Sequence, residues 1–454
     1  MKFAPPEGGV LLASGSLGTA AGHAPEPTRP LRRPSVVAGA IGNTLEWYDF
    51  ATYGYFSVVV GRNFFPSDNP TTSLLSAFAV FAAAFFMRPI GGIVFGHIGD
   101  RYGRKAALLL SAGLMAVSTF AMGCLPTYAS AGLLAPVLLV VLRLGQGLSV
   151  GGEYTSSAIF LSETAEPARR GLTGSLACIG AAGGILLGSI FGTLITGLLT
   201  PEQMEAWGWR VPFLFGIVLG AFIFVLRRQM EERPVGAAPT AAPAAPLPPS
   251  VQRSPLRAAV EVDGSAMLRA FAMNLGLACA FYVVFVYLVT YLHTESGLPQ
   301  HTAFLINTLA MVVQAVCIPI SGALSDRYGR KRVLVLTGAG LTVLAWPLFV
   351  LLTSGQIALI ILSQVVFAVL IAGYAAVVPT AFVEMFQHRS RCTALAISFN
   401  ASMALVGGTA PMAATWIVHH LAWPTGPGLY IAVLSAISLA AVVTMRDRTG
   451  TSLA

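Results

Sequence analysis

The stretch GHIGDRYGRK, residues 96–105, occurs a second time as GALSDRYGRK, residues 322–331. Asp100 and Asp326 therefore lie 226 positions apart, and an apolar run precedes each stretch. A cassette of six identical residues that returns halfway along a chain of this length indicates an internal duplication. The sequence therefore predicts two similar halves.

A second charged cassette repeats at nearly the same interval. Glu163 is followed by Arg169 and Arg170, and 221 positions later Glu384 is followed by Arg391. Both cassettes come directly after an apolar run. The two repeats together support the same division of the chain.

The composition excludes a soluble globular protein. Of the 454 residues 55% are hydrophobic and only 10% are charged, and the mean hydropathy is +0.74, whereas soluble domains carry roughly 25% charged residues. The apolar runs are continuous, which favours helices over alternating barrel strands. Runs of about 20 residues can cross a bilayer as helices, and twelve occur, at about 36–60, 73–98, 106–125, 133–161, 172–199, 211–226, 266–292, 302–323, 333–353, 356–384, 392–419 and 428–445. The predicted fold class is an all-α integral membrane protein with twelve transmembrane helices in two pseudo-symmetric six-helix halves.

The predicted domain boundaries follow from these runs. We expect a disordered cytoplasmic N-terminal tail, an N-terminal six-helix bundle, a cytoplasmic Ala/Pro-rich linker, a C-terminal six-helix bundle and a short cytoplasmic tail, at residues 1–35, 36–226, 227–265, 266–445 and 446–454.

Basic residues predict the orientation. Lys and Arg follow the even-numbered spans, and apart from Arg62 and Arg210 the alternate loops carry none. By the positive-inside rule both termini are cytoplasmic, and we expect a multi-pass protein of the cell inner membrane. The basic residues of the cytoplasmic loops thus account for the formal charge of +8. A nucleic-acid partner is not expected. The five cysteines show no metal-binding spacing, so no cofactor is expected.

The loop G-x-x-x-D-R-x-G-R-K in each half resembles the signature loop of the major facilitator superfamily. Four further stretches are similar to the metabolite:H+ symporter family, which includes proline/betaine, α-ketoglutarate, citrate and shikimate permeases: GNTLEWYDF (42–50), RPIGG (88–92), RLGQGLSVGGEY (143–154) and WGWRVPF (207–213). The resemblance covers essentially all of residues 36–445. It implies a proton-coupled symporter that imports a small polar metabolite by alternating access, in contact with the lipid bilayer and as a monomer.

Five ionisable residues lie inside predicted spans: Glu46, Asp49, Arg88, Arg143 and Glu153. Such a group costs roughly 2.5–3.5 kcal/mol at the bilayer centre, so one that persists normally faces a cavity or a partner. At 1.5 Å per residue the first four fall near the same depth, with Glu153 closer to the cytoplasm. We therefore expect a polar site near the midplane.

The predicted roles in this site divide between proton and substrate. Asp49 or Glu46 is expected to carry the proton, because a carboxylate in a cavity that alternates between wet and dry can take up and release one. The predicted substrate-binding residues are Arg88, Arg143, Tyr53, Gln146, Glu153, Tyr154 and Asn400. The alternative is that the charged residues are structural bridges between helices.

The repeated loop cassettes are predicted to form the cytoplasmic gate. The resemblance implies that the acid caps a neighbouring helix end and bridges basic groups. The predicted gating residues are Asp100, Arg101, Arg104, Lys105, Glu163, Arg169, Asp326, Arg327, Arg330, Lys331, Glu384 and Arg391. The alternative is that these basic residues only enforce topology.

Three other functional classes compete with a symporter: an enzyme, a drug:H+ antiporter and a receptor or sensor, the last of which would need a sizeable soluble output module. Residues 147–151 match GxSxG, but a nucleophile elbow needs a strand, a turn and a helix, and Ser149 lies in an apolar span; the protein is not expected to be an enzyme. A drug:H+ antiporter shares the loop signature and is the alternative function, although the fifth span lacks the Gly-Pro pair typical of such proteins.

Among symporter substrates, a zwitterion such as proline or betaine and a carboxylate such as α-ketoglutarate or citrate both remain open.

Overall fold

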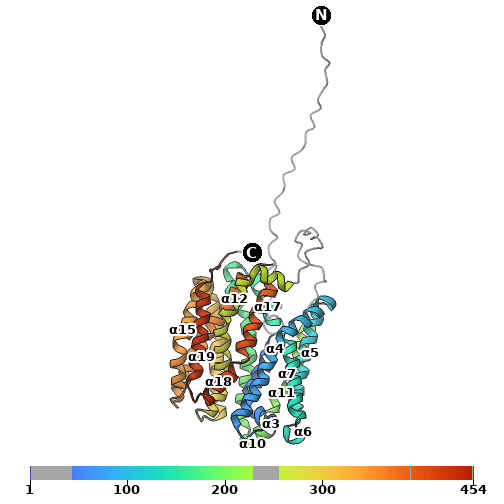
Figure 1. Ribbon diagram of the computed structural model, residues 1–454, viewed down its shortest axis with the longest axis vertical. Helices are drawn as coiled ribbons and strands as arrows, with labels where there is room; N and C mark the ends of the chain where they lie inside the picture. Colours follow the sequence, from blue (N-terminus) through green and yellow to red (C-terminus); the bar gives the residue numbers. More distant parts are fainter. Residues whose placement is uncertain (2–42, 151, 229–254, 389, 452, 454) are drawn as a thin grey trace.

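The computed structural model describes residue 1 and residues 43–150, 152–228, 255–388, 390–451 and 453, except for the side chains of 99, 100, 104, 227, 228 and 255–258. Most of the predicted N-terminal tail and of the linker therefore lie outside the described residues. Within the described ranges all regular secondary structure is helical, in agreement with the expected class. The helices stand side by side as a bundle (Figure 1).

The first half contains the helices that carry most of the predicted site. They are α2 (Thr44–Tyr55), α3 (Ser57–Phe64), α4 (Pro70–Tyr102), α5 (Arg104–Cys124), α6 (Tyr128–Ala131), α7 (Leu134–Ser149), α8 (Glu153–Glu163), the 3₁₀ turn η1 (Pro167–Arg169), α9 (Arg170–Leu198), α10 (Pro201–Gln203), the π-helical η2 (Met204–Gly208) and α11 (Arg210–Arg228).

The second half is built in the same way from helices and short π-helical turns. They are α12 (Pro255–Tyr282), the π-helical η4 (Val283–Tyr287), α13 (Leu288–Thr294), α14 (Gln300–Tyr328), α15 (Arg330–Leu352), α16 (Ile357–Met385), α17 (Arg391–Ser402), the π-helical η5 (Met403–Gly407), α18 (Ala410–His420) and α19 (Gly426–Val443). Helix α12 begins eleven residues before the predicted start of the C-terminal bundle at 266.

Ten helical segments of the described chain are long and apolar enough to cross a membrane. The segments Pro201–Gly208 and Arg210–Leu226, bent by 49° relative to each other, form an eleventh candidate. Helices α2 and α3 occupy the position of the first predicted span. The predicted spans thus all correspond to helices.

The fourth predicted span, 133–161, is not one continuous helix. Helix α7 ends at Ser149 and α8 begins at Glu153. The break coincides with Gly151 and Gly152 in the sequence, and consecutive glycines are unfavourable inside a helix because they lose the most conformational freedom on folding.

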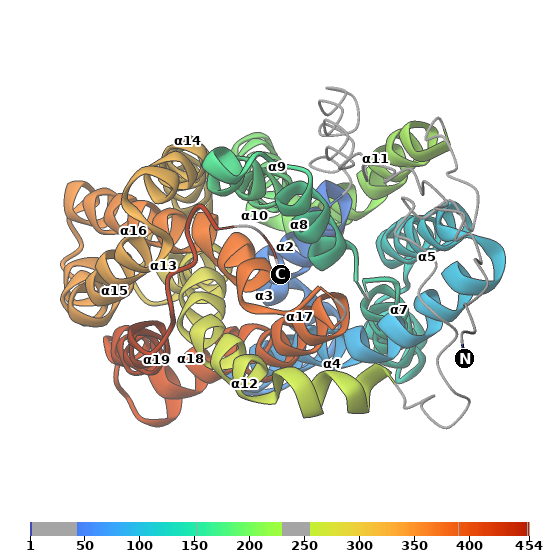
Figure 2. The ribbon, with the colours of Figure 1, turned by 90° about the horizontal axis from the view of Figure 1, so that it is seen from above.

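The two halves lie beside each other and contact mainly through α9 and α14. Seen from above, α5, α7 and α11 lie on one flank and α15, α16 and α19 on the other, with α9 and α14 between them (Figure 2). No other pair of described helices packs as extensively as α9 and α14. Small residues allow the close approach, because a Cβ at Gly171 would lie 2.7 Å from the carbonyl oxygen of Gly322.

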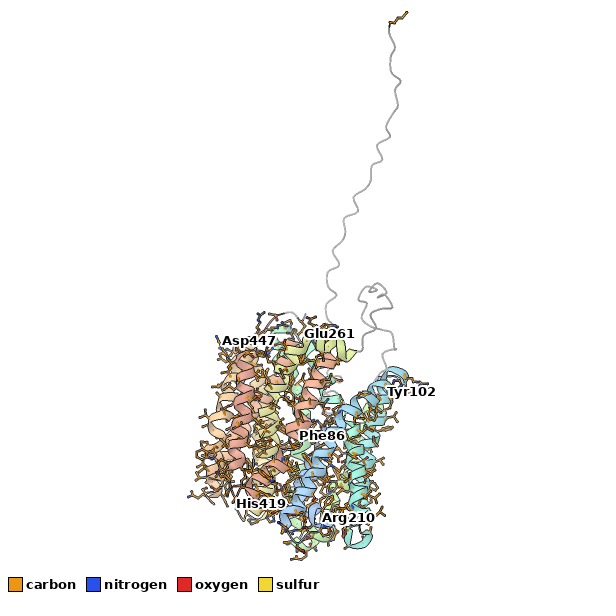
Figure 3. All side chains as sticks on the ribbon, in the orientation of Figure 1. Phe86, Tyr102, Arg210, Glu261, His419 and Asp447 are labelled. Atoms are coloured by element: carbon orange, nitrogen blue, oxygen red, sulfur yellow. The ribbon has the colours of Figure 1, made fainter. Side chains whose placement is uncertain are left out.

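The bundle has two chemically different ends. Tyr102, Glu261 and Asp447 lie at the end that carries both DRYGRK loops, here called the DRYGRK end, and Arg210 and His419 lie at the other, here called the far end (Figure 3). Between them the outer surface is apolar: Phe86 is exposed midway along α4. An apolar girdle of this kind is what a helix bundle presents to lipid.

Candidate functional site

A buried ion pair joins α2 to α4 in the first half. Nη2 of Arg88 donates a hydrogen bond of 2.9 Å to Oε1 of Glu46, and their side chains are only 1% and 6% exposed. The guanidinium also lies over the rings of Phe85 and Phe50, with its carbon 4.6 and 4.8 Å from their centroids. Glu46 and the aromatic faces together compensate the buried charge of Arg88.

A second polar chain runs from α2 to α7. Nε2 of Gln146 donates to Oδ2 of Asp49 at 2.5 Å and to Oγ1 of Thr119 at 3.1 Å. Oε1 of the same amide accepts from Nη1 of Arg143 at 2.8 Å. All four side chains are fully buried. The amide of Gln146 therefore links the carboxylate of Asp49 to the guanidinium of Arg143.

Arg143 is held by aromatic rings on one side and leaves one edge unsatisfied. Its guanidinium carbon lies 4.2 Å from the ring centroid of Tyr53 and 4.9 Å from that of Phe50. Nε and Nη2 have no hydrogen-bond partner among the described residues. These two groups form the edge of a guanidinium that binds a carboxylate through two parallel hydrogen bonds.

An aromatic wall adjoins this pair of arginines and comes from both halves. The Trp47 ring stacks on Tyr282, with centroids 6.3 Å apart, and meets Phe281 edge-on at 5.7 Å. Tyr154 stacks on Phe399 at 4.8 Å and also contacts Trp47 at 5.9 Å. Residues of α2, α8, α12 and α17 thus enclose one side of the site.

The structure brings most of the predicted site residues together, in roles that differ from one residue to another. The hydroxyl of Tyr53 donates to the carbonyl oxygen of Ala77 at 3.1 Å, so its ring positions Arg143 and its hydroxyl is already used. Glu153 and Glu46 line one small cavity toward the DRYGRK end, together with Ser149. Asn400 is buried on α17, directly after Phe399.

Thr119 of α5 is a site residue that the sequence did not single out. It accepts from Gln146 at 3.1 Å and donates to the carbonyl oxygen of Met115 at 2.8 Å. A threonine in an apolar run has the same appearance as a packing residue. Only its position opposite Gln146 reveals its part in the network.

At the DRYGRK end, Asp326 caps a helix of the other half. Its carboxylate accepts from the backbone N–H groups of Gly171 at 2.8 Å and Leu172 at 2.9 Å, which are in the first turn of α9. Nη1 of Arg330 donates to the same carboxylate at 2.8 Å. A negative charge at a helix N-terminus is stabilised by the unpaired N–H groups and the helix dipole, so this contact fastens the two halves to each other.

Buried ion pairs reinforce the cap. Glu384 accepts from Nη1 of Arg170 at 3.3 Å and from Nη2 of Arg330 at 3.4 Å, and all three side chains are at most 4% exposed. Nη1 of Arg391 donates to Glu163 at 2.6 Å. Because Arg170 and Glu163 belong to the first half and Glu384 and Arg391 to the second, both contacts cross between the halves.

The segment after α19 lies over these ion pairs. Nη1 of Arg448 donates to the carbonyl oxygen of Glu384 at 3.0 Å, and the carbonyl oxygen of Thr451 accepts from Arg170 at 3.0 Å. Asp447 accepts from the backbone N–H of Lys331 at 3.2 Å. Partial burial alone would raise the pKa of Asp447, but this bond and those from Thr449 outweigh it and hold the pKa below its usual value.

The remaining predicted gating residues play smaller parts in this structure. Arg169 is exposed, and the ion pair is made instead by the buried Arg170 next to it. Lys331 donates from Nζ to the carbonyl oxygen of Val443 at 2.6 Å. Exposed Arg101 and Arg327 lie over the rings of the neighbouring tyrosines, Lys105 is half-buried, and the side chains of Asp100 and Arg104 are outside the described set.

Toward the far end the halves meet through neutral polar groups. Nδ2 of Asn307 donates to the hydroxyls of Tyr55 and Ser189, both at 3.0 Å. His301 contacts the carbonyl oxygen of Thr193 at 2.9 Å through Nδ1. These residues were not predicted, because single Asn, Ser and Thr residues in apolar runs carry no distinctive pattern. The two halves are thus joined toward both ends of the bundle.

The arrangement offers buried charge and hydrogen-bond donors but no metal site. Among the residues described, no group of three His, Cys, Asp or Glu side chains could hold a metal ion. The GxSxG match is likewise not an elbow, because Ser149 is the last residue of α7 and donates to the carbonyl oxygen of Gln146 at 2.7 Å.

Comparisons with known proteins agree with this architecture. The model of the family Sugar (and other) transporter matches residues 35–235, and that of the Major Facilitator Superfamily matches residues 270–453. Among solved structures, a D-xylose-proton symporter superposes with a TM-score of 0.70 at 19% identity, covering 92% of this chain and 99% of that one. The xylose transporter from E. coli in a partially occluded inward-open conformation gives a TM-score of 0.69 at 16% identity, covering 92% and 99%. These likenesses confirm the twelve-helix fold.

Closer relatives are found among curated proteins. The proline/betaine transporter of Escherichia coli (strain K12) is 33% identical over 419 residues, which cover 91% of this chain and 83% of that protein. The proline/betaine transporter of Salmonella typhimurium (strain LT2) is 32% identical over 418 residues, covering 91% and 83%. Proteins of this kind are membrane transporters and not enzymes, as predicted. The chain belongs to the major facilitator superfamily and, within it, to the metabolite:H+ symporter family.

Proposed function

We propose that this protein is a proton-coupled symporter that imports a small zwitterion with a single carboxylate, such as proline or betaine. It acts in the cytoplasmic membrane, with the DRYGRK end and both termini in the cytoplasm, because the basic loops gather at that end. The relatives named as proline/betaine transporters support the choice of substrate.

The observation that carries the proposal is the chain from Asp49 through Gln146 to Arg143. Arg143 has a free carboxylate-binding edge, formed by Nε and Nη2, and the amide that holds its other side also holds Asp49. A substrate carboxylate on Arg143 adds a negative charge close to Asp49. Protonation of Asp49 removes the repulsion between the two carboxylates, so substrate and proton bind together.

The number of free cationic groups favours a single carboxylate. Arg88 is engaged by Glu46 at 2.9 Å, whereas Arg143 has only neutral hydrogen-bond and aromatic partners among the described contacts. A dicarboxylate or tricarboxylate in this site would have to bury further negative charge without a cation, which is costly. The aromatic wall offers ring faces suited to a quaternary or secondary ammonium group.

The gates supply alternating access. Closure of the DRYGRK end depends on Asp326 at the start of α9 and on Glu384 with its two arginines. Release of these contacts would let the cytoplasmic ends separate while the halves stay joined toward the far end. Substrate and proton would then leave toward the cytoplasm.

Uptake into proteoliposomes tests the proposal. Labelled proline, glycine betaine, α-ketoglutarate and citrate are offered under an imposed inward proton gradient, with and without a protonophore. We expect protonophore-sensitive accumulation of proline or betaine, abolished in Arg143→Gln and retained in the control Arg62→Gln, an exposed arginine at the far end. Accumulation of only the dicarboxylate or tricarboxylate would overturn the substrate class. Proton-driven exchange of cationic dyes without uptake would instead support the antiporter.

A further inference from the structure

Tyr282 is one of the residues through which the second half contacts the charged site. It is the last residue of α12, directly before the π-helical η4, and it is 1% exposed. Its ring packs edge-on against Phe85 at 5.3 Å and Phe81 at 5.9 Å, both on α4 of the first half. On its other face it stacks with Trp47 of α2 at 6.3 Å.

The hydroxyl of Tyr282 has no hydrogen-bond partner among the described residues. The same two rings also carry the arginines, since the guanidinium carbon of Arg143 lies 5.6 Å from the centroid of Phe81 and that of Arg88 lies 4.6 Å from the centroid of Phe85. The hydroxyl of Tyr374, another buried tyrosine, is satisfied, because it donates to the carbonyl oxygen of Met273 at 2.8 Å. A buried hydroxyl without a partner costs about 1–3 kcal/mol, so an unpaired one beside these arginines points to a ligand that supplies the partner.

Three further donors, on two residues of the site, are unpaired among the described residues. Nε1 of Trp47 has no described partner, and neither do Nε and Nη2 of Arg143. Trp47 stacks on Tyr282, and Arg143 and Tyr282 both contact the ring of Phe81, so these donors belong to one site. A carboxylate has two oxygens with about four acceptor positions, enough to use the arginine edge and one hydroxyl at once.

We propose that the hydroxyl of Tyr282 donates a hydrogen bond to the substrate carboxylate held by Arg143, so that the bound substrate connects the two halves. This inference rests on the proposed function, because it assumes a carboxylate at Arg143. It assigns the second half a specific contact in a site whose charged residues all come from the first half. It also explains how occupancy favours closure, since only a ligand with a carboxylate completes the contact from α12.

Tyr282 lies next to a close contact between the two halves. The π-helical turn that follows it packs on the first half, where a Cβ at Gly54 would lie 2.2 Å from Cγ1 of Val286. We therefore expect a shift of the Tyr282 hydroxyl toward a ligand to act on the contact between η4 and α2. π-Helical turns are frequent at functional sites.

The test compares Tyr282→Phe with the matched control Tyr374→Phe in the full-length purified protein. Phenylalanine keeps the ring packing at both sites and removes only the hydroxyl. Binding of labelled proline and glycine betaine is measured in detergent together with the midpoint of thermal unfolding, and KM and the maximal rate are measured in proteoliposomes. Arg143→Gln is included to test the anchor separately.

We expect Tyr282→Phe to weaken binding and raise KM about tenfold for both substrates, with an unchanged unfolding midpoint without substrate and a loss of the stabilisation that substrate gives. Tyr374→Phe should bind like the wild type. Binding within twofold of the wild type in Tyr282→Phe, with binding abolished in Arg143→Gln, would overturn this inference and leave the proposed function intact. Undiminished binding in Arg143→Gln, or no binding by the wild type, would overturn both.

Discussion

Asp49 and Arg143 are joined through one intervening amide, that of Gln146, which donates to the first at 2.5 Å and accepts from the second at 2.8 Å. The acid and the base therefore share a partner. Any ligand that draws Arg143 away from Gln146 also changes the surroundings of Asp49. This arrangement provides a physical basis for coupling and leads to the first prediction.

Replacing Asp49 by Asn should uncouple transport from the proton gradient. The amide is nearly isosteric and can still bond to Gln146, but it cannot carry a proton. We expect accumulation against a gradient to fall to the equilibrium level, while exchange of labelled for unlabelled substrate continues. The control Asp68→Asn changes an exposed acid at the far end and should accumulate substrate normally. Full proton-driven accumulation in Asp49→Asn would contradict the assignment.

Replacing Asp326 by Ala should open the DRYGRK end. The change removes the cap on α9 and the partner of Arg330. Cys178 provides a native reporter, since it is buried and its Sγ lies 3.2 Å from the carbonyl oxygen of Ala375 in the other half. With the other four cysteines replaced, we expect maleimide to label Cys178 several-fold faster. Glu166→Ala, which changes an exposed acid at the same end, is the control. Equal labelling rates in both variants would refute the role of Asp326 in closing the DRYGRK end.

Replacing Glu384 by Gln should destabilise the protein strongly. Two buried arginines, Arg170 and Arg330, would lose their common carboxylate, and breaking a buried ion pair from one side costs about 3–5 kcal/mol. In Glu163→Gln the lost carboxylate is 32% exposed, so a cost of about 1 kcal/mol is expected. Thermal unfolding in detergent compares the two, and a smaller loss for Glu384→Gln than for Glu163→Gln would argue against the buried network.

Replacing Gly147 by Ala should disrupt the packing of α7 on α4. A Cβ there would lie 2.0 Å from the carbonyl oxygen of Ala84, a backbone atom that cannot move aside alone. We expect a loss of about 1–3 kcal/mol, seen as a lower unfolding midpoint and a lower yield of monodisperse protein. A Cβ at Gly145 on the same helix would lie 3.4 Å from the Ser118 hydroxyl and 4.0 Å from Cδ1 of Leu114, so Gly145→Ala should be nearly neutral. Equal behaviour of the two variants would mean that the helices are less closely packed.

Replacing Arg448 by Ala should weaken closure of the DRYGRK end modestly. The side chain donates to the carbonyl oxygen of Glu384 at 3.0 Å, so its loss frees the segment that lies over the ion pairs. We expect about two- to threefold faster labelling of Cys178, which corresponds to a single hydrogen bond of ordinary strength. The exposed Arg446 offers the control Arg446→Ala. Unchanged labelling in Arg448→Ala would show that the segment is only a passive covering.

The repeated loops and the apolar runs were sufficient to predict the helices and their division into halves, because membrane insertion leaves few alternatives to a helix of about 20 residues. The grouping of Glu46, Asp49, Arg88 and Arg143 was also predictable, since buried charges need partners and depth along a helix is simple arithmetic. The pairing among these four charged residues was not predictable. Depth alone does not distinguish Arg88, which binds Glu46, from Arg143, which binds an amide.

Rotation about the helix axis accounts for most of what the sequence did not predict. Arg169 and Arg170 are adjacent and chemically identical, yet only the second faces the other half. The contributions of Thr119 and of Asn307 depend on a partner from a helix far away in sequence. The break between Ser149 and Glu153 was signalled by glycines that could equally have served close packing.

The close contact of α9 with α14 has a mechanical consequence. Small residues bring the two helices together near Gly171 and Gly322, and Gly192 lies against the Phe304 ring toward the other end. The two halves can therefore rotate as rigid bodies about this pair of helices. Each helix has 29 residues and is about 44 Å long, so a tilt of about 10° about the midpoint moves each tip by roughly 4 Å. Such a tilt opens the central site at one end of the bundle and closes it at the other in a single movement. Neither helix has to bend, because each is long enough for a small angle to displace its ends by this amount.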